Sequence, residues 1–211
     1  MNFKLEVMIA ELCRQLLAEL KTSKSPLLSY LQPGISKEVV DDTLRKANLD
    51  IVFPDEVYSL YGWKNGINED ESELKDLGEL SLFQLGIFTS LNLSMNSYLG
   101  WAVQKGYWSQ GLFPLFESGG GDYYLIDTNS KSTTYKMILL YSPSNPYIRH
   151  AVSIFDSLDS WLTSVIECYR QKAYFFDSDS SYLEIDPKIQ NAIWRKNNPN
   201  SEYFRILENY K

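Results

Sequence analysis

The stretch FPDEVYSLYGWKNG, residues 53–66, predicts one short helix with a defined beginning and end. Pro54 suits the first helical position, where its missing N–H is no loss, and the two carboxylates that follow favour the positive end of the helix dipole. The inward stripe at helical spacing consists of Val57, Leu60 and Tyr61. Asn65 or Gly66 can take the left-handed conformation that closes a helix. We therefore expect a short helix that is buried on one side.

The same stretch, with its proline, acidic pair, aromatic turn and Trp-Lys-Asn-Gly ending, resembles the signature of the SUKH superfamily. A second match, LFPLF at 112–116 followed by GGGDYYLID at 119–127, is similar to the two central strands of that family and the turn between them. A third and weaker match is SLDSWL at 157–162, the entry into a late helix. The signature residues are Pro54, Trp63, Asn65, Gly66, Pro114, Gly120, Gly121 and Asp122.

The resemblance covers residues 36 to 173 and implies both a fold and a class of function. It implies an α+β fold in which helices pack against an antiparallel sheet. It also implies a binding protein without catalytic residues or cofactor. Bacterial members are typically immunity proteins that neutralise a cognate toxin, often a nuclease or deaminase, and fungal members regulate cell-wall assembly.

The composition is that of a chain able to bury a full core. Its 211 residues are 44% hydrophobic and 14% aromatic, which favours one domain with an appendage. Large aromatic side chains fill cores and are also enriched at protein interfaces, so their number fits either use.

The net charge of -7 argues against direct nucleic-acid binding, because phosphate contacts need clustered Lys and Arg. An acidic surface favours a basic partner or serves solubility. Cys13 and Cys168 have no zinc or redox spacing and are expected to be buried thiols of a reducing compartment. Charges are scattered through residues 1–21, and no later run is apolar enough to span a bilayer, so we expect a cytoplasmic protein without a membrane segment.

Three regions follow from the patterning. Residues 1–35 are expected to form an amphipathic helix and a connector, residues 36–176 the SUKH-like domain, and residues 177–211 a helical extension docked on it. The first helix can pack on its own domain or on a partner, which leaves a homodimer open.

Within the central region, Ser36 is expected to cap a helix to about residue 47, with Val39, Val40 and Leu44 inward. A second helix is predicted over residues 90–105, using Leu93, Leu99 and Val103. Extended segments are predicted at 83–88, 112–116, 122–127, 135–141 and 151–155. Short links between neighbouring strands indicate an antiparallel meander.

The most acidic stretch is expected to be an exposed loop. Its carboxylates are Glu69, Asp70, Glu71, Glu73 and Asp76. Such a run is a solvated face or an electrostatic landing site for a basic partner. With the aromatic residues Trp63 and Tyr107, it is our candidate partner-binding surface.

The sequence offers little support for catalysis or metal binding. His150 lies in a Pro-rich loop without a recognisable orienting partner and is expected to be a surface side chain. The glycines at 119–121 lack the features of a phosphate-binding loop and predict a tight turn. Nothing in the sequence shows Asp122 and Asp127 converging, and one histidine with two distant cysteines supplies no zinc site.

The sequence is therefore compatible with three functions. The first is an immunity protein that binds a cognate toxin, and acidic steering onto a basic nuclease agrees with it. The second is a regulatory scaffold of the cell-wall type; such members tend to carry long disordered flanks that this chain lacks, which favours immunity. The third is a small enzyme, which would need a deep pocket with converging polar groups.

Overall fold

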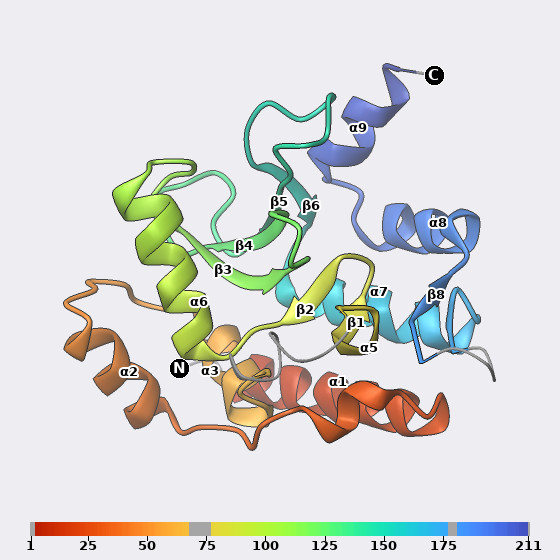
Figure 1. Cartoon of the computed structure of the whole chain (residues 1–211), viewed down its shortest axis with the longest axis horizontal. Helices are drawn as coiled ribbons and strands as arrows, with labels where there is room; N and C mark the ends of the chain where they lie inside the picture. The colour runs from red at the N-terminus through yellow and green to blue at the C-terminus, as the bar shows by residue number, and fades with distance from the viewer. Residues whose placement is uncertain (1–2, 68–76, 177–180, 211) are drawn as a thin grey trace.

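A six-stranded antiparallel sheet forms the centre of the molecule (Figure 1). The computed structural model describes residues 3–67, 77–176 and 181–210. The strands are β1 (Ser81–Phe83), β2 (Gly86–Phe88), β3 (Leu112–Glu117), β4 (Tyr123–Asp127), β5 (Ile138–Tyr141) and β6 (Val152–Phe155). Each strand pairs with the next one along the chain, so the sheet is a meander. The predicted α+β class with an antiparallel sheet is confirmed.

The remaining elements surround this sheet. They are α1 (Phe3–Thr22), η1 (Pro26–Ser29), α2 (Lys37–Lys46), α3 (Asp55–Trp63), α5 (Leu77–Leu80), α6 (Leu91–Ser97), the π-helical η2 (Tyr98–Gln104), α7 (Leu158–Arg170), α8 (Pro187–Asn197) and α9 (Glu202–Glu208). A separate short pair joins β7 (Tyr174–Phe175) to β8 (Glu184–Ile185).

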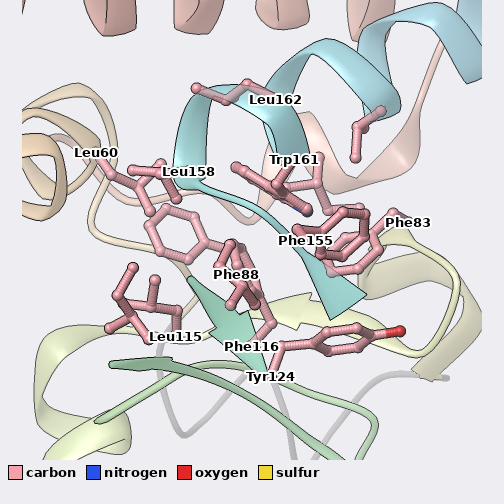
Figure 2. Close-up of a cluster of buried hydrophobic side chains, with 14 of the residues drawn as sticks. Leu60, Phe83, Phe88, Leu115, Phe116, Tyr124, Phe155, Leu158, Trp161 and Leu162 are labelled. Atoms are coloured by element: carbon pink, nitrogen blue, oxygen red, sulfur yellow. The ribbon is translucent and has the colours of Figure 1, made fainter. Parts of the chain in front are cut away.

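The core lies between the sheet and α7 (Figure 2). Trp161 of α7 is fully buried, and its ring lies 4.5 Å from Phe116 and 5.6 Å from Phe83. Ser157 caps the N-terminus of α7, and its side chain and that of Ser160 form a capping box. Truncating a buried aromatic of this kind costs about 3–5 kcal/mol. The packing of α7 thus fixes which sheet face is interior.

Helix α1 packs against α7 and α3, with α7 between it and the sheet (Figure 1). The stripe that faces inward is fully buried and consists of Ile9, Cys13, Leu16 and Leu20. Cys168 of α7 is buried as well, and both cysteines are free thiols. The amphipathic face of α1 is therefore satisfied within the chain itself.

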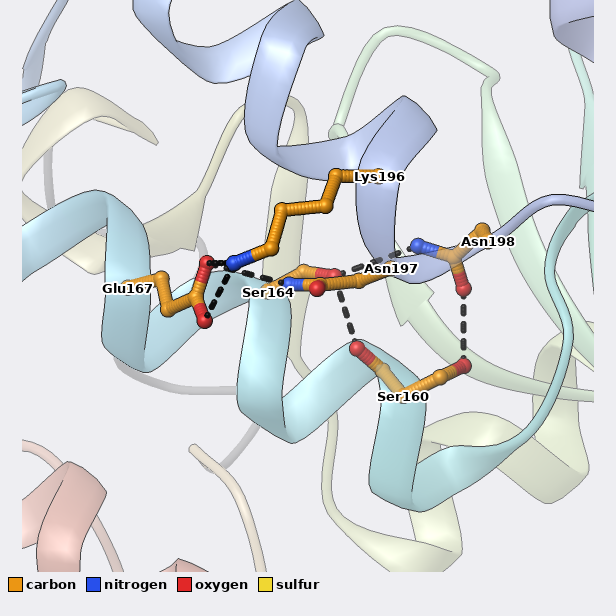
Figure 3. Close-up of polar contacts among 6 residues, drawn as sticks. All are labelled: Ser160, Ser164, Glu167, Lys196, Asn197 and Asn198. Carbon is orange, nitrogen blue, oxygen red and sulfur yellow. Dashed lines mark hydrogen bonds and ion pairs between the residues drawn. The ribbon is translucent and has the colours of Figure 1, made fainter.

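The C-terminal helices are tied into the same core. Trp194 of α8 is 2% exposed, and its ring lies 4.7 Å from that of Phe155. The buried Asn198 side chain donates to Ser164 Oγ and accepts from Ser160 Oγ at 2.7 Å (Figure 3). Helix α9 then lies along the edge strand β6. Ordered contacts thus attach these helices to α7 and to the sheet edge.

Several local predictions were wrong. Pro54 is the residue before α3 and not its first residue, because its backbone is extended (ψ 151°). The strand expected from residue 135 begins at Ile138, since Lys136 has a positive φ and bonds back to Asp127 in a turn. Val39 is 48% exposed, so α2 buries only Val40 and Leu44.

The face of the helix at 90–105 also differs from the prediction. Val103 is 41% exposed, and the buried side chains are Leu91, Ser94, Met95, Tyr98 and Ala102. Polar Ser94 turns inward because its hydroxyl bonds with those of Tyr61 and Thr89, at 3.1 and 2.7 Å. A satisfied hydroxyl can be buried at little cost, which hydrophobic periodicity does not anticipate.

Candidate functional site

Two signature residues of the first motif, Asn65 and Gly66, connect the end of α3 to the segment that begins α6. The Asn65 side chain accepts a hydrogen bond from the Leu91 backbone N–H at 3.0 Å, which joins the end of α3 to the start of α6. Gly66 has φ +58°, and a Cβ there would lie 2.4 Å from the backbone of Thr89. Only glycine fits this crossing without displacement. We therefore assign these positions a structural role.

The second motif is likewise structural. The glycine turn joins β3 to β4, and Gly121 has φ +99°. Ser118 Oγ accepts from the Gly120 and Asp122 backbone N–H groups and donates to the Asp122 carboxylate, which also accepts from Ser142. The polar groups of this turn are thus satisfied by one another and by Ser142, and the predicted tight turn is confirmed. Pro114 lies in the adjacent strand β3.

The carboxylates of Asp122 and Asp127 do not converge. They flank opposite ends of β4, which separates them by roughly 17 Å at the rise of an extended strand. Asp127 is buried and accepts from Thr134 Oγ1 at 2.7 Å. His150 is exposed, and its Nε2 lies 4.0 Å from a Glu202 carboxylate oxygen.

Among the grooves of the described residues, one is lined by Ser142, Arg149 and His150, but the Ser142 hydroxyl donates to the Asp122 carboxylate and not to His150. Another of about 550 Å³ lies beside the end of α1 and is lined by Glu19, Thr22, Ser23, Tyr169, Lys172, Tyr174, Phe175 and Phe176. Its carboxylate, Glu19, is paired with Arg170. Among residues 3–67, 77–176 and 181–210, no group of three or more His, Cys, Asp or Glu is placed to hold a metal ion.

The predicted partner-binding residues fall in different parts of the molecule. Glu69, Asp70, Glu71, Glu73 and Asp76 lie outside the described residues. Trp63 is partly buried at the end of α3, close in sequence to the Asn65 contact with the start of α6. Tyr107 is 52% exposed and follows the far end of η2. The continuous helix of residues 91–104 is about 20 Å long, so its start, near Trp63, and its end, near Tyr107, are about that far apart.

Tyr107 belongs to a group of rings that we call the aromatic cluster, formed by Trp101, Tyr107, Trp108, Tyr123 and Tyr141. The Tyr107 ring stacks on that of Trp101 at 5.4 Å and on that of Tyr141 at 6.5 Å. Trp108 is buried beneath them, with its ring 5.0 Å from Tyr123 and 5.1 Å from Tyr141. The cluster thus has a buried base and an exposed outer ring.

The strands position this cluster by simple alternation. Phe116 and Tyr124 point to the core beneath α7, so their neighbours Glu117 and Tyr123 point to the opposite face. Glu117 pairs with Tyr123 across β3 and β4, and Tyr123 pairs with Tyr141 across β4 and β5. These three side chains therefore form one row across the sheet.

The loop after η2 lays the remaining rings over the row. The Tyr107 backbone N–H donates to the Trp101 carbonyl at 2.9 Å, which folds Tyr107 back onto Trp101. Trp108 Nε1 donates to the Leu112 carbonyl at 3.1 Å. The first bond fixes the backbone of Tyr107, and the second fixes the side chain of Trp108.

Two charged side chains border the cluster. Lys105 places Nζ 3.9 Å from the centre of the Trp101 ring, a cation–π contact. Burial raises the pKa of the Glu117 carboxyl, while a hydrogen bond from Ser97 opposes that rise. Burial also raises the pKa of Tyr123, and the charge of Glu117 raises it further.

Of the residues in and around this cluster, the sequence analysis named Tyr107, and it did not identify Trp101, Tyr123, Tyr141, Lys105 or Glu117. The sequence signal that could have identified Glu117 and Tyr123 is the alternation of core-facing and outward-facing residues along β3 and β4. This alternation could not be recognised in the sequence because both strands also carry hydrophobic residues at their outward-facing positions.

The chain matches a known family model over much of its length. Residues 38–164, more than half of the chain, match the model of the SMI1 / KNR4 family (SUKH-1). A search of curated proteins finds no match. No helix in the described ranges is both long enough and apolar enough to cross a membrane. The chain therefore belongs to the SMI1 / KNR4 family of the SUKH superfamily.

Proposed function

We propose that this protein is a non-catalytic immunity protein that binds and neutralises a cognate bacterial toxin, with a basic nuclease or deaminase as the expected target. The observation that carries the proposal is the exposed side of the aromatic cluster. Tyr107 is half exposed and is held in place by stacking rather than by the core. Rigid aromatic side chains of this kind provide the central contacts of many protein interfaces.

Charge supports the same proposal. A toxin that acts on nucleic acid presents a basic surface, and the net charge of -7 would steer this chain onto it. We include the acidic stretch Glu69–Asp76 in the proposed surface as the source of part of this steering. Both cysteines are buried and unpaired, which suits the reducing cytoplasm where such a toxin would act.

A regulatory or scaffold role is the second candidate, since the matched family includes cell-wall regulators as well as immunity proteins. It would use the same exposed rings to bind an enzyme of the host cell. The two candidates differ in the identity of the partner and in whether binding abolishes the activity of that partner.

The experiment that separates them uses the purified protein as bait in its native lysate, with a search of adjacent genes for a secreted toxin. We expect a basic nuclease or deaminase to co-purify in a one-to-one ratio and to lose activity in the complex. Recovery of cell-wall or signalling enzymes alone, with their activity intact, would overturn the immunity proposal in favour of the regulatory role.

A further inference from the structure

The carboxylate of Glu117 is only weakly satisfied by its surroundings. It is partly buried at the end of β3, and Ser97 Oγ donates to it over 3.5 Å, the limit of a hydrogen bond. No basic side chain among the described residues forms an ion pair with it. A half-buried carboxylate without a cation costs stability, so a binding partner that supplies one would relieve that cost.

The carboxylate lies beside the aromatic cluster. Glu117 is directly opposite Tyr123 in the β3–β4 pair, and the Ser97 that contacts it stands one helical turn before Trp101. The side chains of Glu117 and Tyr123 therefore lie next to each other on the same face of the sheet.

The cluster already holds a cation of the chain itself. Lys105 Nζ is 3.9 Å from the centre of the Trp101 ring and 5.8 Å from that of Tyr107. Lys105 is exposed, so this contact is weak and can be displaced. The ring faces are thus oriented to receive positive charge.

We propose that the aromatic cluster and Glu117 form a recognition site for an arginine side chain of the partner protein. The proposal rests on the proposed function, because it names the partner group that the same surface binds. Arginine fits better than lysine: its planar guanidinium stacks on aromatic rings and also donates in parallel to a carboxylate. Lys105 occupies part of the site until the partner arrives.

The test uses a short capped peptide, acetyl-Gly-Arg-Gly-amide, and a matched peptide in which citrulline replaces arginine. Citrulline has nearly the same shape without the charge. Binding to the full chain is followed by NMR of the tryptophan indole groups. We expect the arginine peptide to shift the Trp101 signal with increasing dose, and the citrulline peptide to bind at least five-fold more weakly.

Variants locate the site. Glu117→Gln keeps the shape of the side chain and removes its charge, so we expect about ten-fold weaker binding of the arginine peptide, a change of the size given by one charge-assisted hydrogen bond. Lys105→Ala should instead tighten binding about two- to five-fold, because the competing cation is lost. Glu38→Gln, on the exposed face of α2, is the control and should change nothing. Unchanged circular dichroism verifies that each variant is folded.

The outcomes separate this proposal from the immunity proposal. If the arginine peptide binds as expected but no toxin is neutralised, the site stands and the function is wrong. If a toxin is neutralised but both peptides bind alike, or Glu117→Gln binds the arginine peptide as well as the wild type does, the arginine site is wrong. An absence of any Trp101 shift with millimolar arginine peptide also overturns it.

Discussion

The rings of Trp101 and Tyr107 lie 5.4 Å apart and almost parallel, at an interplanar angle of 15°. Tyr107 is outside the helix that carries Trp101, and a backbone hydrogen bond between the same two residues returns it over the helix end. The inner ring is partly buried and the outer one is 52% exposed. This pair therefore extends the partly buried rings of the aromatic cluster to the surface, where the outer ring is accessible to a partner.

Tyr107→Ala tests whether that surface binds the partner. Because the ring is exposed and rigid, we expect about a 30-fold loss of affinity, the effect of a typical interface hot spot. The free energy of unfolding should fall by only about 1 kcal/mol, since the half-exposed ring is held mainly by stacking on Trp101 and Tyr141. Calorimetric titration with the captured toxin gives the affinity, and urea unfolding gives the stability.

Tyr210→Ala is the matched control for that substitution. Tyr210 is 63% exposed and contacts Tyr147 near the C-terminus, away from the cluster. Its removal should leave affinity unchanged. Equal losses in both variants would show that the effect is not specific to the aromatic cluster.

Charge reversal in the acidic stretch tests electrostatic steering. Replacing Glu69, Glu71 and Glu73 by Lys should lower the association rate constant about ten-fold at low salt and reduce its dependence on ionic strength. Stopped-flow fluorescence at several salt concentrations measures both effects. An unchanged rate constant would remove this stretch from the proposed surface.

Trp194→Ala tests whether the C-terminal helices are part of the cooperative fold. The ring is buried against Phe155, and the residue lies beyond the 38–164 match. We expect a loss of about 3–5 kcal/mol in the free energy of unfolding. Urea unfolding followed by fluorescence and by circular dichroism provides the measurement, and a loss below about 0.5 kcal/mol would mean that α8 is only a surface appendage.

Glu117→Gln has a pH-dependent effect on stability. Burial raises the pKa of the Glu117 carboxyl in the folded state above its ordinary value of 4.5. The folded state therefore binds this proton more tightly than the unfolded state, so the contribution of Glu117 is fully present below about pH 4.5 and is lost as the pH rises through the folded pKa. The glutamine variant should thus melt at a higher temperature than the wild type at pH 7.

The melting difference should shrink as the pH falls toward 4. Thermal scans of both proteins between pH 4 and pH 8 follow this trend. A variant that is less stable at pH 7 would contradict the assigned burial of an uncompensated charge.

The two thiols should be inert in the native protein. Burial raises the pKa of Cys13 and of Cys168 to about 12, so the reactive thiolate is almost absent at pH 8. Ellman's reagent should modify them only as fast as the chain unfolds, and both should react at once in denaturant. Rapid modification at pH 8 without denaturant would place a cysteine at the surface.

Much of the fold could be predicted from local patterns. The Ser36 cap was predicted correctly because side-chain capping depends on residues close in sequence. The strands around LFPLF and YYLID were also predicted correctly, since apolar β-formers bordered by glycine define them. The prediction of which face of α6 points inward was wrong. Ser94 is buried because it forms hydrogen bonds with hydroxyl groups of residues distant in sequence, which a local pattern does not reveal.

The candidate site was harder to predict. Tyr107 was named from its sequence position alone, whereas Tyr123 and Tyr141 join it only through the register of two strand pairs. Glu117 belongs to the candidate site because it lies opposite Tyr123 of β4 and accepts a hydrogen bond from Ser97 of α6. These two neighbours lie on different elements. Residues that converge through tertiary structure cannot be grouped before the strand order is known.

Neutralisation by this protein is expected to be stoichiometric and to depend on the aromatic cluster, and a titration of toxin activity measures both. A fixed amount of the captured toxin is mixed with increasing amounts of this protein, and residual toxin activity is measured. We predict a linear fall to zero at a ratio of one to one, with Tyr107→Ala requiring a large excess. Full toxin activity at a large excess of the wild-type protein would show that this protein does not neutralise the toxin.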